Sequence, residues 1–502
     1  MTIAPAEISE WVGLAVGALL LGRCATSGAP LRSWIDAGAW GFVLLPVLLS
    51  STLFASLLLG GPVPGPVMTT AVVLGAAALL RALAKRSARA AADRSGQAHI
   101  AEPADHEPTA QSPARRALLL LPLGAAALAV WAAGDWDDPI PGGSWDSMAI
   151  WNTGARVLVR GTGDWPALFS DRVIGHPDYP LMVPGTLASV WAAVGAESPT
   201  APRSVALAFL LGLGLMTFSS VRRFCGSSCA ALATTLVLGT PILAEMVRAQ
   251  LADTALALLL LAAVSALASR FSADPRRRAP AWLAGLAWGA LPWCKNEGAV
   301  LALVVVVAFA LCCWFGRRTQ PGTWGERLAL AAGAALPLGV LLAFKMAWAP
   351  DDPMFSDVGT TLATHLPDPS RWANALKGFT DQMNPWADGA TWGLATSFDR
   401  WGYAWPATAL VALVGLLRGR PFRCDHRLFL GLVAVGCLAA YFAVYVTTPA
   451  RSQTWHIETS LFRLLLQIFP TVLLWACAIA AAKSDTEPDH EPPVASETID
   501  HG

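Results

Sequence analysis

The chain is dominated by apolar stretches that are long enough to cross a membrane. A spanning helix needs about 20 mostly apolar residues, and such stretches recur along the whole sequence. They lie at about 11–26, 36–60, 64–84, 117–133, 203–221, 228–246, 251–269, 279–294, 298–316, 328–348, 403–417, 428–447 and 461–482. Only 14% of the residues are charged, whereas soluble domains have roughly a quarter. We therefore exclude a soluble enzyme and predict an all-α polytopic membrane protein with about 13 transmembrane helices.

The basic residues predict an orientation for these helices. Loops rich in Lys and Arg stay in the cytoplasm, and Arg222-Arg223 and Arg317-Arg318 fall on the same side as segment 85–116. The two long loops at 134–202 and 349–402 are acidic and fall on the opposite side. The pattern places the N-terminus outside and the C-terminus inside. Much Ala and Arg with few Lys is typical of a bacterium with GC-rich DNA, so we predict its cytoplasmic membrane.

Composition also divides the chain into four parts. Segments 85–116 and 483–502 are rich in Ala, Pro, Glu, Asp and His, a composition typical of a disordered linker and tail. The linker separates three N-terminal helices within 1–84 from the remaining helices within 117–482. We interpret 1–84 as an accessory module and 117–482 as the catalytic core.

Two helices are expected to lie at the membrane interface within the first long loop. From Trp145 to Arg160, apolar and polar residues alternate with helical period, as in a helix on a membrane surface. The stretch from Tyr179 to Gly195 is apolar enough to tempt assignment as a span. Counting it as a span would place Arg222-Arg223 outside and move every later loop to the opposite side of the membrane. We therefore interpret it as a second helix in the outer interface.

Several short motifs follow one another on the predicted outer face. They are Ala155–Leu158 (Ala-Arg-x-Leu), Gly163–Trp165 (Gly-Asp-Trp), His176-Pro177, Gln250–Asp253, Lys295–Gly298 and Arg463. In this order the chain resembles the GT-C glycosyltransferases, which include protein O-mannosyltransferases and aminoarabinose transferases. The resemblance covers about 117–470. It implies a polyprenyl-phosphate sugar donor, an active site on the extracytoplasmic face, and inverting transfer to a glycan, lipid or protein of the cell envelope.

The transfer needs a base for the incoming hydroxyl group and cations for the departing phosphate. We predict Asp146 as the base. The family often has an acidic pair at this position, whereas Ser147 follows Asp146 here, so Asp138 and its neighbours Asp135 and Asp137 remain candidates. Four residues are predicted to bind the donor phosphate: Lys295, Arg463, Arg451 and His456.

Further residues of the same loops are candidates for binding the sugar or the acceptor: His176, Asp178, Tyr179, Arg156 and Glu297. The outer loops contain no close His pair and no Asp-x-Asp-x-Asp pattern. We therefore predict no metal site and no cofactor, although the isolated Asp135-Trp-Asp137 leaves a divalent metal open. Equal numbers of basic and acidic residues, 35 each, give no reason to expect nucleic acid.

Two other functions are compatible with the same pattern. A transporter or lipid flippase would place its charged residues near the middle of the membrane. Asp253, Lys295 and Lys345 are instead predicted near the outer ends of their helices, which argues against this alternative. The second alternative is a catalytically silent scaffold of the same fold.

Overall fold

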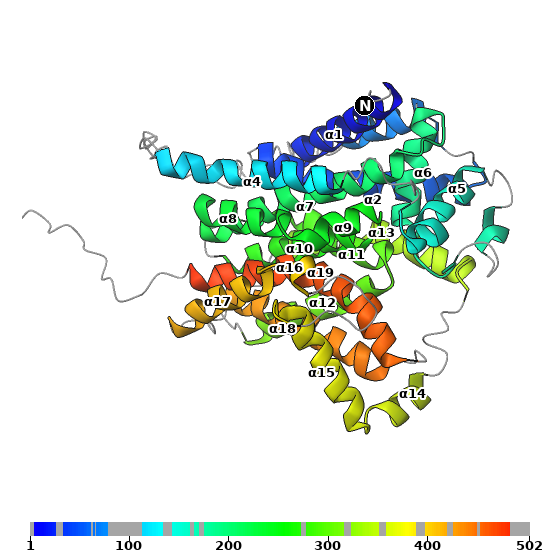
Figure 1. Cartoon of the computed structure of the whole chain (residues 1–502). Coiled ribbons are helices and arrows are strands. Elements are labelled where there is room, and N and C mark those ends of the chain that lie inside the picture. Colours follow the sequence, from blue (N-terminus) through cyan, green and yellow to red (C-terminus); the bar gives the residue numbers. More distant parts are fainter. Residues whose placement is uncertain are drawn as a thin grey trace, which may run out of the picture.

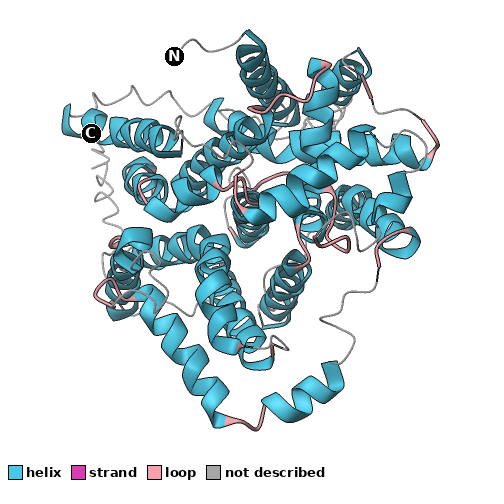
Figure 2. Cartoon of the chain, turned by 45° about the vertical axis from the view of Figure 1, so that its right-hand side comes forward, coloured by secondary structure: helices cyan, strands magenta, loops and turns pink. Residues whose placement is uncertain are grey.

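The computed structural model describes most of the chain as helix. The described residues are 5–26, 34–61, 64–65, 67–78, 113–133, 143–160, 165–169, 175–272, 278–315, 323–350, 358–387, 397–418, 425–448 and 452–481. Within these ranges every regular element is helical, and Figure 2 shows them as helices joined by short loops. The all-α prediction is confirmed for this part. The predicted tail and nearly all of the predicted linker lie outside the described residues.

The helices follow the chain in the order predicted from the apolar stretches. The first half contains α1 (Pro5–Thr26), α2 (Trp34–Leu58), a helix at Val67–Ala78, α4 (Pro113–Ala133), α5 (Thr153–Arg160), α6 (Met182–Val194), α7 (Ala201–Cys225), α8 (Ser227–Leu238), α9 (Pro241–Arg248) and α10 (Asp253–Ala268). The second half contains α11 (Ala281–Cys294), α12 (Glu297–Phe315), α13 (Trp324–Ala347), α14 (Val358–His365), α15 (Pro369–Met383), α16 (Ser397–Trp401), α17 (Ala404–Leu417), α18 (His426–Thr447) and α19 (Gln453–Ala480).

Membrane-spanning length is reached by fewer helices than the sequence predicts. Among the described residues, seven helices are long and apolar enough to cross a membrane, and the bent pair α8 and α9 makes eight. Every other predicted stretch also falls on a helix. Some of these helices are short, such as α11 with its 14 residues, and in α1 and α4 only the shorter parts Gly13–Thr26 and Ala117–Ala133 stand out as apolar. The protein is thus polytopic, while the count of about 13 spans stays a prediction.

The stretch predicted as one span at 228–246 is broken in the middle. Its two halves, α8 and α9, meet at an angle of 53°. Gly239 ends α8, and Pro241 stands at the start of α9. Proline kinks or breaks a helix because it lacks the amide proton and its ring clashes with the preceding turn. After α9, residues 249–252 connect directly to α10.

Helix α10 occupies the centre of the bundle. All of its residues are buried, and it packs against α7, α11 and α19. The long helices lie side by side in Figure 1, with α5 and α6 gathered at the right-hand end of the view. Since α10 has no polar face apart from its ends, chemistry on this helix is confined to those ends.

Paired arginines lie at one end of the bundle, and Asp253 lies at the other. At one end, Arg222 of α7 binds Asp36 at 2.8 Å, and Arg270 after α10 binds Glu326 at 2.7 Å. The opposite end of α10 begins at Asp253. This polarity matches the arginine-rich and acidic loops of the sequence. Which end faces the cytoplasm stays a prediction.

Helix α2, predicted to belong to an accessory module, packs into the same core as the later helices. The indole of Trp293 donates to Ser50 at 3.1 Å. The ring of Phe54 lies 5.7 Å from each of the rings of Trp165, Trp293 and Trp348. The structure therefore joins α2 to α11 and to the end of α13, and an accessory role for 1–84 stays a prediction.

The two helices of the first long loop differ from the prediction. Ser147–Asn152 forms a π-helix that precedes α5. Trp151 is buried, whereas Trp145 and Met148 are exposed. A π-helix has more residues per turn than an α-helix, so residues 147–152 do not keep the α-helical period that the sequence predicts.

The second of these helices, α6, is packed within the protein, with residues 182–191 buried. Two of its hydroxyl groups contact the middle of α2. Thr186 donates to the carbonyl of Pro46 at 3.2 Å, and Ser189 donates to that of Leu49 at 3.3 Å.

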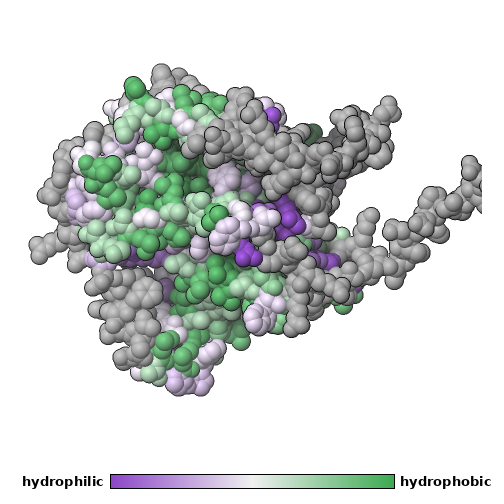
Figure 3. Space-filling model, turned by 180° about the vertical axis from the view of Figure 1, so that it is seen from behind, coloured by the Kyte–Doolittle hydropathy of each residue, from purple (hydrophilic) through white to green (hydrophobic). Residues whose placement is uncertain are grey.

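The outer surface carries the apolar side chains that a lipid environment requires. Exposed leucines and tryptophans include Leu123 and Trp131 of α4, Leu303 of α12 and Leu342 of α13. Figure 3 shows broad hydrophobic areas on one face, with the most hydrophilic residues visible to the right of the centre of the view. Apolar exposure on this scale is expected where helices face lipid chains.

Candidate functional site

One guanidinium group joins two carboxylates from distant parts of the chain. Arg463, on α19, donates from Nη1 to Oδ2 of Asp146 at 2.6 Å. Its Nε and Nη2 atoms each donate to Oδ2 of Asp253 at 3.2 Å. Arginine suits this position because its planar group carries donors that point in several directions. The first long loop, α10 and the last helix therefore meet at Arg463.

Asp253 is the buried anchor of the site. Its side chain is fully buried, and its other oxygen, Oδ1, accepts from Lys295 Nζ at 3.1 Å and from Gln467 Nε2 at 2.5 Å. Tyr441 in turn donates to Gln467. A buried charge is tolerated only when it is paired and hydrogen-bonded, and Asp253 fulfils both conditions. Its place in the first turn of α10 adds the favourable helix dipole.

Lys295 reaches this position through a tight turn between α11 and α12. The turn consists of Lys295, Asn296 and Glu297 and closes on Gly298. A Cβ atom at Gly298 would lie 1.9 Å from the carbonyl oxygen of Leu291, so only glycine fits. The turn also brings Glu297 Oε1 within 3.0 Å of Lys295 Nζ.

The site as a whole contains more carboxylates than cations. Asp146, Asp253 and Glu297 face Lys295 and Arg463. The carboxylates differ in access: Asp253 is fully buried, whereas 27% of the Asp146 side chain and 26% of the Glu297 side chain are exposed. Asp146 therefore lies at the accessible edge of a charged cluster whose centre is closed. We call these five residues the ion-pair cluster.

A second polar group lies on the other side of the same turn. Asn296 donates to Oδ2 of Asp178 at 2.6 Å and accepts from Lys345 Nζ at 3.0 Å. Lys345 also donates to the backbone carbonyl of Asp178. Residues 295–297 therefore connect the ion-pair cluster to the loop that carries Asp178.

Aromatic rings extend this second group toward the surface. His176 stacks on Tyr179 with ring centroids 4.9 Å apart, and Tyr179 lies 5.6 Å from Trp151. Loss of water around the Tyr179 phenol raises its pKa well above the ordinary value, and the nearby carboxylates of Glu297 and Asp178 raise it further. The phenol therefore stays protonated and neutral over the physiological pH range.

The structure brings together some of the predicted site residues but not others. Asp146, Lys295, Glu297 and Arg463 meet in the ion-pair cluster, and His176, Asp178 and Tyr179 lie beside it. Arg156 is directed elsewhere, against Glu197 at 3.8 Å and over the ring of Trp191. The ring of His456 contacts Thr448 Oγ1 at 2.8 Å. Asp135, Asp137, Asp138 and Arg451 lie outside the described residues.

Several residues of the site were not predicted as functional. Lys345, Gln467, Tyr441 and Asn152 were given no functional role. Gln250, Asp253 and Asn296 stood in two of the motifs, but they too were given no role in the site. Gln467 could have been found, because it stands four residues after Arg463 and therefore on the same face of the helix. Polar side chains inside an apolar span are themselves a signal of function. Asn152 and Gln250 carry no such signal.

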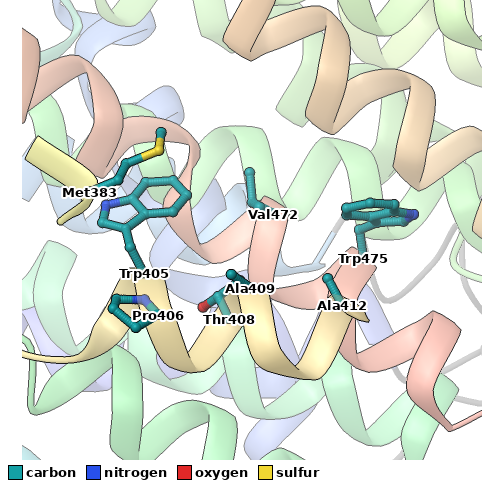
Figure 4. A pocket seen from close by; sticks show the side chains of 8 residues that line it. All are labelled: Met383, Trp405, Pro406, Thr408, Ala409, Ala412, Val472 and Trp475. Atoms are coloured by element: carbon teal, nitrogen blue, oxygen red, sulfur yellow. The ribbon is translucent and has the colours of Figure 1, made fainter. Parts of the chain in front are cut away.

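The described part of the chain offers no cluster of metal ligands beside the ion-pair cluster, and one apolar pocket lies apart from it. No group of three or more His, Cys, Asp or Glu side chains there could hold a metal ion. A pocket of about 220 Å³ lies between α17 and α19, with Met383 at its edge. Figure 4 shows that Trp405 and Trp475 line it together with small apolar side chains. None of its lining residues belongs to the ion-pair cluster.

Comparison of the chain with models of protein families, with curated proteins and with solved structures gave no match in any of the three.

Proposed function

We propose that this chain is a membrane glycosyltransferase that moves a sugar from a polyprenyl phosphate to an extracytoplasmic acceptor with inversion. The observation that carries the proposal is the shared binding of Asp146 and Asp253 by Arg463. It combines an accessible carboxylate with two cations at one end of the helix bundle. A site of this kind needs no metal and no nucleophilic side chain. The proposal also agrees with the GT-C resemblance of the sequence.

In the proposed reaction the accessible carboxylate acts as the base, and the cations bind the departing phosphate. The acceptor hydroxyl oxygen forms a bond to the anomeric carbon while the bond from that carbon to the phosphate oxygen breaks. The hydroxyl proton passes to Asp146, and the bonding electrons leave with the polyprenyl phosphate. A single displacement of this kind inverts the anomeric configuration.

Arg463 and Lys295 neutralise the departing phosphate in this scheme. Both are paired with carboxylates in the structure, so the phosphate must compete with Asp146 or Glu297 for them. Asp253 keeps its partners, because it is buried and held from two sides. The phosphate therefore draws Arg463 away from Asp146, which frees that carboxylate to accept a proton.

A proton-coupled transporter is the second candidate. It is favoured by the excess of carboxylates over cations in the cluster, since a partly paired acid near a membrane can carry a proton. The position of the cluster at the ends of α10, α11 and α12 argues for the transferase instead. A transporter would move its substrate without forming a new glycosidic bond.

The test is transfer from radiolabelled polyprenyl-phosphate sugars in membranes that contain the full chain. Wild type is compared with Asp146→Asn and with Asp381→Asn as a matched control. Asp381 lies on α15 and pairs with Lys377. Both side chains are exposed, and neither residue belongs to the ion-pair cluster. We expect transfer by wild type and by Asp381→Asn, and its loss in Asp146→Asn. A labelled substrate that crosses the membrane unchanged would instead indicate the transporter.

A further inference from the structure

Two buried amide side chains join the loop that carries Asp146 to the turn that precedes Asp253. Asn152 donates from Nδ2 to Oε1 of Gln250 at 2.8 Å, and both residues are almost fully buried. Asn152 ends the π-helix that follows Asp146. Gln250 stands three residues before Asp253. The hydrogen bond therefore connects the two chain segments whose carboxylates bind Arg463.

Gln250 adopts a backbone conformation that side chains rarely accept. Its φ angle is 56°, and it is the one residue other than glycine with positive φ among the described residues. Such a conformation is unfavourable and persists only when its surroundings enforce it. Strained residues of this kind concentrate at functional sites, and so do π-helical turns. Here the two features face each other.

A second set of contacts joins the same two segments. Ser144 donates to the carbonyl of Ala249 from its amide at 3.3 Å and from its hydroxyl at 3.2 Å. Gly143 has a φ of 77°, and a Cβ atom there would lie 2.9 Å from the same carbonyl oxygen. The chain therefore approaches residues 249 and 250 as closely as glycine allows. We call Gly143, Ser144, Asn152, Ala249 and Gln250 the clamp.

The two carboxylates depend on the clamp to different degrees. Asp253 is fixed by α10 and accepts hydrogen bonds from Lys295, Arg463 and Gln467. The only side chain bonded to Asp146 among the described residues is Arg463, and the Asp146 carboxylate caps no helix. The position of Asp146 is therefore set by its backbone, which the clamp holds on both sides.

We propose that Asn152 and Gln250 are positioning residues that set the distance between Asp146 and Asp253, so that one guanidinium can bind both. They touch no substrate themselves. This inference rests on the proposed function for its effect on catalysis, but its structural part does not. Without the clamp, the π-helix would lose its attachment to the turn before α10, and Asp146 would move away from Arg463.

The structural part is tested by a double-mutant cycle on the purified full chain in detergent micelles. Asp146→Asn is combined with Gln250→Gly, which removes the amide but suits the positive φ. We expect Asp146→Asn to lower the Tm in the wild-type background and to have less than about half that effect with Gln250→Gly. Asn374→Ala is the control background, because it removes an amide contact between α15 and α19 at 3.3 Å.

The catalytic part is tested in the transfer assay. Gln250→Gly and Asn152→Ala should each lower kcat roughly tenfold to a hundredfold, the range expected for a displaced catalytic group. The KM for the lipid donor should stay nearly unchanged. The exchanged pair Asn152→Gln with Gln250→Asn keeps both amides, and Asn accepts positive φ more readily than most residues. It should restore much of the lost kcat.

The outcomes separate this inference from the proposed function. Equal Tm losses from Asp146→Asn in all three backgrounds would overturn the clamp, and so would an unchanged kcat in both single variants of an active enzyme. If wild type transfers no sugar but the cycle gives the expected coupling, the clamp stands and the proposed function fails. If Gln250→Gly does not fold, Asn152→Ala replaces it in the cycle, because it leaves the backbone of the turn untouched.

Discussion

Arg463 binds Asp146 at 2.6 Å although the two residues are 317 positions apart in the sequence. The same guanidinium binds Asp253, which is 210 positions away. Contacts of such range form only when the whole helix bundle is assembled. The ion-pair cluster is therefore a product of the complete fold, and its residues are suited to report on both folding and function.

Replacing Arg463 by lysine should separate charge from geometry. Lysine keeps the positive charge but offers a point charge on a flexible stem, so it cannot bind both carboxylates as the guanidinium does. We expect Arg463→Lys to fold with a lower Tm and to lose transfer at least about a hundredfold. Full activity in Arg463→Lys would mean that only the charge matters there. The Tm and the transfer rate in membranes are the two measurements.

Asp253 and Asp146 should respond differently to the same substitution. Asp253→Asn leaves Lys295 and Arg463 buried with less compensation, and uncompensated buried charges cost roughly 3–5 kcal/mol of stability. We expect low yield and a strongly reduced Tm for Asp253→Asn. Asp146→Asn should lower the Tm less than Asp253→Asn does, because its side chain is partly exposed, and should lose transfer. If the yields of the two variants were alike, Asp253 would not be the anchor of the site.

The sequence predicts where the helices lie better than it predicts how they end. Apolar stretches mark every long helix, because a spanning segment must be apolar throughout. The break between α8 and α9 was not predicted, although Gly239 and Pro241 stand at it. The apolar residues on both sides were counted together as one stretch.

The sequence predicted several charged residues of the candidate site, but it did not predict which residues bind one another. Asp146, Lys295 and Arg463 stand out because charged residues are costly in a membrane protein. The partners Asn296 and Gln467 are neutral amides, and their importance arises only from residues that the fold brings beside them. The π-helix after Asp146 ends at Asn152, whose partner Gln250 lies 98 positions further along the chain.

The contact of Glu197 with Arg160 predicts a dependence of stability on pH. Arg160 donates twice to Glu197, each time at 2.6 Å, and these hydrogen bonds lower the pKa of the Glu197 carboxyl. A lowered pKa in the folded state stabilises the fold above the unfolded pKa of about 4.3, and this stabilisation is lost as the pH falls through the folded pKa.

The variant Glu197→Gln should therefore have a slightly lower Tm than wild type at pH 7. Arg160 is largely exposed, so water and salt screen the pair and the difference in Tm should be small. The Tm values should converge once the pH falls below the folded pKa of Glu197. A constant difference across the whole pH range would show that packing of Glu197, and not its charge, stabilises this loop.

Gly298 provides a test of the turn that positions Lys295. A Cβ atom there would meet the carbonyl oxygen of Leu291 at 1.9 Å and its carbonyl carbon at 2.4 Å. Neither backbone atom can move without separating α11 from α12, so Gly298→Ala should displace Lys295 from Asp253. We expect a large loss of transfer and a lower Tm.

Gly339→Ala in α13 is the matched control, because its Cβ would meet nothing within 4 Å. Alanine favours helix over glycine by about 1 kcal/mol, so this control should be as stable as wild type or slightly more stable. Equal behaviour of the two variants would contradict the role of the turn.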